Sequence, residues 1–144
     1  MPSFSTLGSV TPVAVFLDVE IHKLHRAFTP AADIHQAQAC KLNSSGLVIP
    51  IVGGTDVKDA CIGYAMNTVL QASGDQATII MRGYTHITGE ASATMTVGPV
   101  KYTGYNTTTG RPTFSPATIG TDAVWGHALE AGASGAAIEI VLLG

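Results

Sequence analysis

Apolar residues in this sequence fall in short runs that alternate with turns rich in Gly, Ser, Thr and Pro. Short runs bounded by turn residues are typical of β-strands, and no segment of helical length has the apolar periodicity of a helix. Leu129–Ala133 favours a helix by propensity alone, but its glycine and small residues favour a loop. The pattern predicts an all-β chain, either a small β-barrel or a sandwich. The expected strands of the first part are residues 13–21, 37–42, 47–52, 62–66 and 76–82.

The chain contains one phrase twice. Ile62–Met66 and Trp125–Leu129 both read as a bulky apolar residue, glycine, an aromatic ring, alanine and a long apolar residue. After a spacer, each phrase is followed by a glycine turn and a strand ending in glycine, at residues 74–83 and 135–144. Internal repeats of this kind predict a fold built from similar units.

The match extends upstream to Lys41-Leu42 and Lys101-Tyr102, each of which is followed by a glycine turn, the second at residues 103–110. The pseudo-repeats therefore cover residues 36–83 and 96–144, and we expect them to form one β-barrel over residues 36–144. The alternative is that short strands bounded by glycines look alike by chance. The glycines of the phrase are expected where a backbone or ring packs against the missing side chain. The structural repeat positions are Gly63, Tyr64, Gly83, Trp125, Gly126 and His127.

Residues 1–35 match neither repeat and are expected to form an N-terminal arm and a first strand. Residues 1–12 contain Pro2, Gly8 and Pro12 among Ser and Thr, a composition typical of an extended arm. Val13–Ile21 is a β-rich run. Whether this run is a barrel strand or a binding arm stays open.

Composition narrows the class of protein. Of 144 residues, 46% are hydrophobic and 12% are charged, which excludes disorder and fits a compact domain partly covered by partners or copies. The formal net charge is −3 with no basic tract, so we expect no direct nucleic-acid binding. We also expect no membrane segment and no secretion signal. Cys40 and Cys61 are expected to be buried, reduced thiols, with a disulfide left open.

Residues with catalytic or metal-binding chemistry are scattered. His22, His25 and His35 lack the spacing of a metal site on a strand, where residues three apart face opposite sides. Asp56 and Asp59 could lie near Glu90 or Glu130 and form an acid pair, but nothing selects that arrangement over solvated charges. We therefore predict a protein that is not an enzyme and has no cofactor or metal.

The ordered features of residues 36–144 resemble the capsid decoration, or cement, proteins of tailed-bacteriophage heads, whose small barrel is often called a β-tulip. In such proteins a Lys-Leu strand and a glycine turn lead to an Ile-Gly-aromatic-Ala phrase, as at Lys41-Leu42 and Ile62–Ala65. A Gly-Asp turn follows, as at Gly74-Asp75, and a phrase like Trp125–Ala131 precedes the apolar last strand. Residues 1–35 lie outside the resemblance.

The resemblance implies a structural virion protein that binds the outer surface of the head and stabilises the assembled capsid, after synthesis in the host cytoplasm. The partner would be the major capsid protein, and the protein would be a homotrimer, with a dimer as the alternative. We also expect Ile138–Leu143 to be an exposed apolar strand that packs between copies. A small binding module or tail component is the alternative function. The expected capsid-interface residues are Phe4, Val13, Val15, Phe16, Leu17, Val19 and Ile21.

Overall fold

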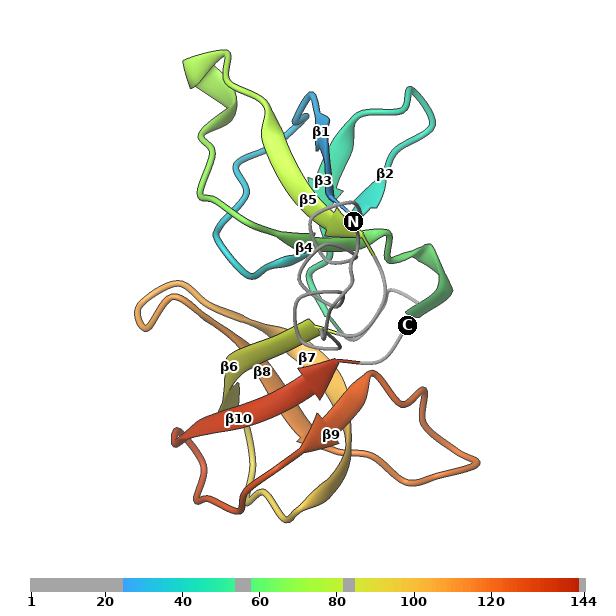
Figure 1. Cartoon of the computed structure of the whole chain (residues 1–144), viewed down its shortest axis with the longest axis vertical. Helices are drawn as coiled ribbons and strands as arrows, with labels where there is room; N and C mark the ends of the chain where they lie inside the picture. Colours follow the sequence, from blue (N-terminus) through green and yellow to red (C-terminus); the bar gives the residue numbers. More distant parts are fainter. Residues whose placement is uncertain (1–24, 54–57, 82–84, 143–144) are drawn as a thin grey trace, which may run out of the picture.

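The computed structural model describes residues 25–53, 58–81 and 85–142, and it confirms the all-β prediction (Figure 1). The chain forms two lobes that follow one another in sequence. We call residues 25–81 the first half and residues 85–142 the second half. The ten strands divide equally between them.

The strands of the first half are short and joined by turns and two single-turn 3-10 helices, η1 (Lys58–Ala60) and η2 (Gln71–Ser73). The sheet has the order β1-β5-β4-β2-β3, and its pairs are antiparallel. Its strands are β1 (His25–Phe28), β2 (Ala39–Leu42), β3 (Val48–Pro50), β4 (Gly63–Ala65) and β5 (Ala77–Met81).

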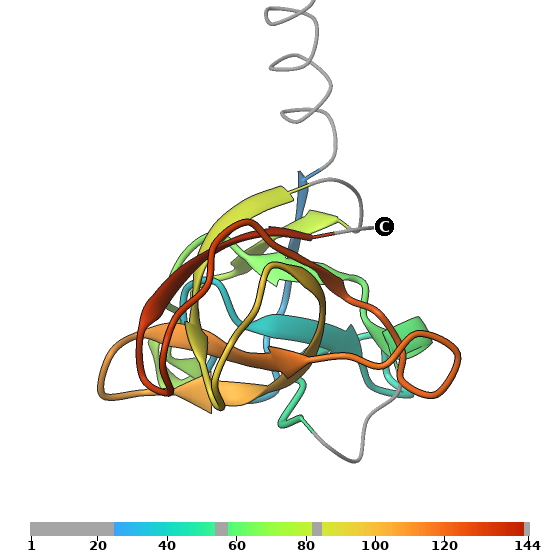
Figure 2. The ribbon, with the colours of Figure 1, turned by 90° about the horizontal axis from the view of Figure 1, so that it is seen from below.

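The second half is a closed barrel, whose strands curl around a common core when it is seen from below (Figure 2). The order around the barrel is β10-β6-β8-β7-β9, and the parallel pair β6–β8 is one of its seams. Its strands are β6 (Thr85–Ala91), β7 (Gly98–Asn106), β8 (Arg111–Pro116), β9 (Gly126–Ala128) and β10 (Ala137–Leu142).

Both halves follow one strand plan. Written from its first strand, the first half runs β1-β5-β4-β2-β3 and the second runs β6-β10-β9-β7-β8, so each strand has a counterpart five places later. The first half also has the parallel seam, reduced to a single bridge between Pro30 and Val48. The N–H of Ala31 donates to the Val48 carbonyl at 2.9 Å, as the N–H of Ser92 donates to the Phe114 carbonyl at 2.8 Å. Each half therefore forms its own ring of strands, and the two do not share one barrel over residues 36–144.

The repeated phrase occupies one register position in both halves. Gly63 pairs with Met81 and with Cys40, and Gly126 pairs with Leu142 and with Val100. The N–H of Met66 donates to the Thr78 carbonyl and that of Leu129 to the Glu139 carbonyl. The aligned phrases of the sequence are thus aligned in space.

A close backbone approach requires glycine at this position. A Cβ on Gly63 would overlap the carbonyl oxygen of Ile80, and a Cβ on Gly126 would overlap that of Val141. Ile80 and Val141 are themselves counterparts, since each precedes the residue that pairs with its glycine. The expectation that a backbone packs against both glycines is confirmed.

The same plan gives two equivalent cores. In the first half the buried residues Ile34, Cys40, Val48, Ala65 and Ile79 pack together. Their counterparts in the second half belong to the larger core, namely Met95, Val100, Phe114, Ala128 and Ile140.

Two expectations are wrong, one about where the first sheet starts and one about the exposure of the last strand. The first sheet starts upstream of residue 36, because β1 pairs with β5 along its whole length and Ile34 bridges to Val69. The last strand does not present an apolar face, because Ile138, Ile140 and Leu142 are all buried inside the barrel. Alternation along a strand sends these residues inward and the intervening Glu139 outward.

Candidate functional site

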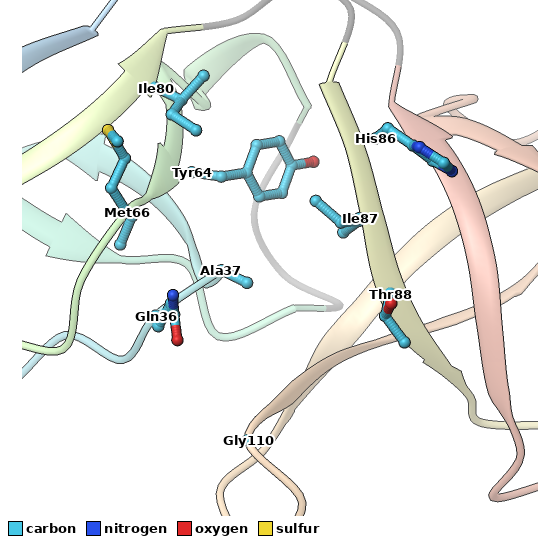
Figure 3. Close-up of a pocket in the computed structure, with 10 residues that line it drawn as sticks. Gln36, Ala37, Tyr64, Met66, Ile80, His86, Ile87, Thr88 and Gly110 are labelled. Atoms are coloured by element: carbon cyan, nitrogen blue, oxygen red, sulfur yellow. The ribbon is translucent and has the colours of Figure 1, made fainter.

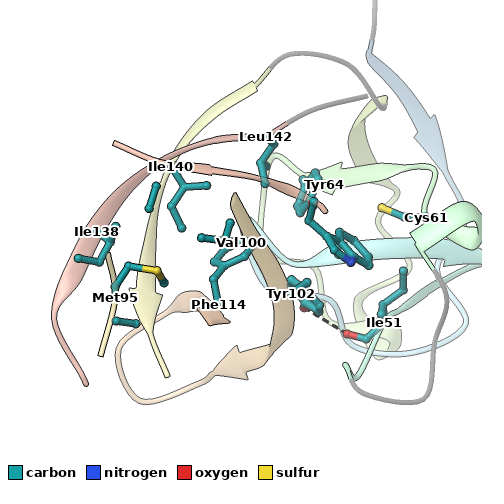
Figure 4. Packing of buried hydrophobic residues seen from close by; sticks show 14 residues of the cluster. Ile51, Cys61, Tyr64, Met95, Val100, Tyr102, Phe114, Ile138, Ile140 and Leu142 are labelled. Atoms are coloured by element: carbon teal, nitrogen blue, oxygen red, sulfur yellow. Dashed lines mark hydrogen bonds between the residues drawn. The ribbon is translucent and has the colours of Figure 1, made fainter. Parts of the chain in front are cut away.

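The two halves meet through one face of the first half. Ala39, Ile51, Cys61 and Tyr64 lie in this cap face, and they are buried in the core of the second half (Figure 4). The residues they cover are Tyr102, Trp125 and Leu142, which we call the barrel end. The Tyr102 ring stacks on Trp125 at 5.1 Å between centroids and meets Phe114 edge-on at 5.7 Å.

Two tyrosine hydroxyls tie the halves together. Tyr102 donates to the Ile51 carbonyl at 3.2 Å, and Tyr105 donates to the Gln36 carbonyl at 2.7 Å. Residues three apart on a strand normally face opposite sides, but the register of β7 shifts between Tyr102 and Gly104. This β-bulge adds one residue to β7, so both tyrosine side chains face the first half and both hydroxyls bond to its backbone. The Tyr105 ring also stacks on His35 at 5.4 Å.

Sequence reasoning missed this bulge, because residues 103–110 were expected to be a turn. The strand β7 continues to Asn106, and Gly104 lies within it. A glycine inside a strand pattern is the signal that could have indicated a bulge.

A pocket of about 470 Å³ lies beside the junction (Figure 3). The Tyr64 ring points across it from the first half towards Ile87 of the second half. The lining is mainly apolar, which suits an apolar or aromatic ligand better than a charged one. The lining residues are Gln36, Ala37, Tyr64, Ala65, Met66, Ile80, His86, Ile87, Thr88 and Gly110.

One histidine, His86, lines this pocket, and its Nε2 lies 2.7 Å from Oε2 of Glu139. Both side chains are about half exposed, so solvent screens the pair. Within the described ranges, no three His, Cys, Asp or Glu side chains come together as a metal site. The pocket is therefore a hollow that is open to solvent, with the His86–Glu139 contact at its edge.

The two cysteines are buried, as expected, and they do not form a disulfide with each other. Sγ of Cys40 donates to the Gln38 carbonyl at 3.3 Å, and Sγ of Cys61 donates to the Gly63 carbonyl at 3.5 Å. Burial, together with the nearby Cys61, raises the pKa of the Cys40 thiol from its ordinary 9.0 to about 12. Cys40 is therefore a protonated packing residue at neutral pH.

Glu90 is a buried carboxylate that the sequence did not single out for this role. Its Oε1 accepts hydrogen bonds from Asn106 Nδ2 at 3.0 Å and from Thr109 Oγ1 at 2.7 Å. These contacts hold the β7–β8 hairpin against β6. Glu130 accepts instead from the Glu139 N–H at 2.9 Å. Asp56, one of the aspartates considered for an acid pair, lies outside the described residues.

The expected structural positions lie within this junction or next to it. Tyr64 is in the cap face, Trp125 is in the barrel end, and His127 is exposed on β9. The capsid-interface residues lie outside the described part of the chain, as does Gly83. Those interface residues are Phe4, Val13, Val15, Phe16, Leu17, Val19 and Ile21.

Several large apolar side chains remain exposed on the described surface. Met66 and Leu129 are 41% and 49% exposed, and they hold equivalent positions in the two halves. Both halves therefore leave an apolar side chain exposed at the same position, which marks a surface available to a partner. The other members of this set are Leu42, Val52, Leu70, Val97 and Ile119.

No protein-family model matches the chain, and a comparison with curated proteins finds no match. In the portions of the chain that the structure describes, no helix has the length and apolar character needed to cross a bilayer.

Proposed function

We propose that this protein is a structural virion protein that binds the outer surface of a phage head and stabilises the assembled capsid. One observation carries the proposal. The phrases that resemble decoration proteins sit at the same register position of both halves, around Gly63 and Gly126. Part of the resemblance therefore rests on two glycines that a close backbone approach requires, in addition to turns that many β-proteins share.

The low share of charged residues and the exposed apolar side chains also support a role in assembly. The partner is the major capsid protein, and the protein acts as a homotrimer at three-fold positions of the shell, with a dimer as the alternative. Neither nucleic acid nor membrane is part of the proposed contact.

The N-terminal stretch provides the proposed contact. An arm such as residues 1–21 can add a strand to a sheet edge of a coat subunit, where main-chain hydrogen bonds supply affinity. Ordering the arm costs roughly 1–2 kcal/mol per residue, so one arm binds weakly. Several arms on one oligomer bind strongly through effective concentration, and binding to the intact lattice stabilises it.

The test mixes the protein with heads assembled without it, and with free coat subunits. We expect binding to heads alone and a higher temperature of head disruption. Deleting residues 1–12 is expected to leave a folded protein with sharply reduced head binding. Val15→Asp or Phe16→Asp should weaken binding, while Leu70→Asp, at an exposed apolar residue outside the arm, serves as the matched control. A truncated protein that decorates heads at full occupancy would place the contact elsewhere, on turns such as Gly53–Asp56.

A second candidate function is a small-ligand binding module, which the pocket beside Tyr64 favours. Titration with apolar and sugar ligands, followed by tyrosine fluorescence, tests it. Saturable ligand binding by a protein that ignores heads would replace the first proposal with the second.

A further inference from the structure

The contact between the two halves joins two different surfaces. The first half contributes its cap face, and the second half contributes its barrel end. Because both halves follow one plan, each chain also has a second cap face and a second barrel end. The strand register identifies the residues that form this second cap face and this second barrel end.

The second cap face consists of Pro99, Ala117, Val124 and His127. Pro99 pairs with His127 as Ala39 pairs with Tyr64. The N–H of Ala117 donates to the Pro99 carbonyl at 2.9 Å, as the N–H of Ile51 donates to that of Ala39 at 2.8 Å. Trp125 is the counterpart of Ile62, so Val124, directly before Trp125, is the counterpart of Cys61, directly before Ile62.

The second barrel end consists of Leu42, Ile62 and Met81. Leu42 pairs with Val48 as Tyr102 pairs with Phe114, and Met81 pairs with Gly63 as Leu142 pairs with Gly126. The N–H of Ile62 donates to the Cys40 carbonyl at 2.9 Å, as the N–H of Trp125 donates to that of Val100 at 2.8 Å.

Burial separates the used surfaces from the unused ones. In the joined pair, Tyr64, Tyr102 and Trp125 are 6%, 5% and 6% exposed. In the unused pair, Leu42 is 39% exposed, Ile62 and Met81 are partly exposed, and His127 is exposed. Thus, among the residues that the structure describes, none caps the Leu42–Ile62–Met81 end of the first half, and the cap face of the second half covers no core.

We propose that a second copy of this chain fills the gap, with the cap face of its second half seated on the Leu42–Ile62–Met81 barrel end of the first half. The occupant follows from the internal junction, where the counterpart cap face of the first half covers the counterpart barrel end of the second half. Such a contact is head-to-tail, so it closes into a ring or continues as a filament. The inference relies on the proposed function only for the number of copies, since a homotrimer is then a ring of six halves.

The contact between copies is more polar than the internal junction. His127 is the counterpart of Tyr64, because the two pair with the counterpart residues Pro99 and Ala39. Arg26 is the counterpart of Ile87, because the two pair with the counterpart residues Ile79 and Ile140. Fewer aromatic contacts make this junction weaker, so assembly is expected to depend on concentration.

Complementation between two variants tests the proposal, with mass measured by sedimentation across a concentration series. Leu42→Asp damages the barrel end and His127→Asp damages the cap face, and each is expected to raise the dissociation constant at least tenfold. Mixing the two leaves one intact pair of surfaces, so the mixture is expected to form a two-chain complex and nothing larger. Leu70→Asp is the matched control, because Leu70 is 55% exposed and belongs to neither surface.

A second pair of variants tests the same contact by strengthening it. His127→Tyr and Arg26→Ile copy residues of the internal junction, and both are expected to tighten association several-fold. Circular dichroism confirms that each variant is folded.

Three results would overturn the inference. One is a protein that stays monomeric at its solubility limit, and another is a mixture of the two Asp variants that does not associate. The third is assembly that survives both Asp variants but is lost on deleting residues 1–24, which would assign the contact to that segment. A protein that assembles but ignores heads defeats only the proposed function. One that binds heads as a monomer defeats this inference and the proposed homotrimer, but leaves head binding itself intact.

Discussion

The two halves of the chain have the same strand order and register, yet they differ in what lies at the end of each core. The second half ends in Tyr102, Trp125 and Leu142, all buried under the first half. The first half ends in smaller, partly exposed side chains, Leu42, Ile62 and Met81. Of the two equivalent ends, the one covered by a neighbouring half thus carries two aromatic rings, and the one that no described residue covers carries Leu, Ile and Met.

The largest expected effect separates these two ends. Trp125→Ala removes a buried ring that stacks on Tyr102, and we expect a loss of about 3–5 kcal/mol in the free energy of unfolding. Ile62→Ala, at the equivalent but partly exposed position, should lose roughly 1–2 kcal/mol. Denaturant unfolding of the monomer measures both. Equal losses would show that the two ends are buried alike in solution.

The glycine phrase offers the next test, because here the halves should behave alike. Gly63→Val and Gly126→Val both force a side chain onto a carbonyl group, and each is expected to destabilise the fold by about 1–3 kcal/mol. Thr78→Val, on the neighbouring strand β5, controls for valine itself and should change stability by less than about 0.5 kcal/mol. If both glycine variants unfold like the parent protein, the two phrases are not equivalent core positions.

The hydroxyls at the junction should matter less than the packing. Tyr102→Phe keeps the stacked ring but leaves the buried Ile51 carbonyl without its donor, so we expect a loss of about 1 kcal/mol. Tyr105→Phe removes a more exposed bond to Gln36, and the loss should stay within about 0.5 kcal/mol. Thermal unfolding distinguishes the two, and the reverse order would mean that the Gln36 contact dominates the junction.

The smallest effect concerns Cys40, whose counterpart in the second half is Val100. With its pKa raised to about 12, the folded thiol keeps its proton between pH 9 and 12 while the unfolded thiol releases it. Stability is therefore fully present below pH 9 and falls as the pH rises through this window. Cys40→Val should flatten that fall and change little at pH 7. An unchanged alkaline slope would assign the fall to other groups, such as Tyr102, whose pKa is also raised by burial.

The part of the fold that could be predicted was local and repeated. Apolar runs between glycine turns indicated the strands, and the phrase around Gly63 and Gly126 aligned the halves in the register that the backbone adopts. Glycine carried this information because a close backbone approach excludes every other residue at that point.

Other features depended on contacts distant in sequence. The strand β1 was not recognised, since His25–Phe28 carries little alternation and is defined by pairing with β5. Glu90 gave no sign of burial, because its hydrogen-bonding partners come from a hairpin further along the chain. The N-terminal stretch, which includes Val13–Ile21, stays a prediction.

By itself, the sequence determined that the chain is β-rich, that it is duplicated and where its two halves correspond. Only the tertiary structure decided that the second half closes into a barrel by itself, that a single bridge joins the edges of the first sheet, and that the cap face of the first half covers the barrel end of the second. The physical reason is that alternation along a strand separates inward from outward side chains within one unit. It does not tell which outward face meets a neighbour, because that depends on how the linked halves dock. Tyr64 and His127 occupy the same position of one phrase, and docking alone makes one buried and the other exposed.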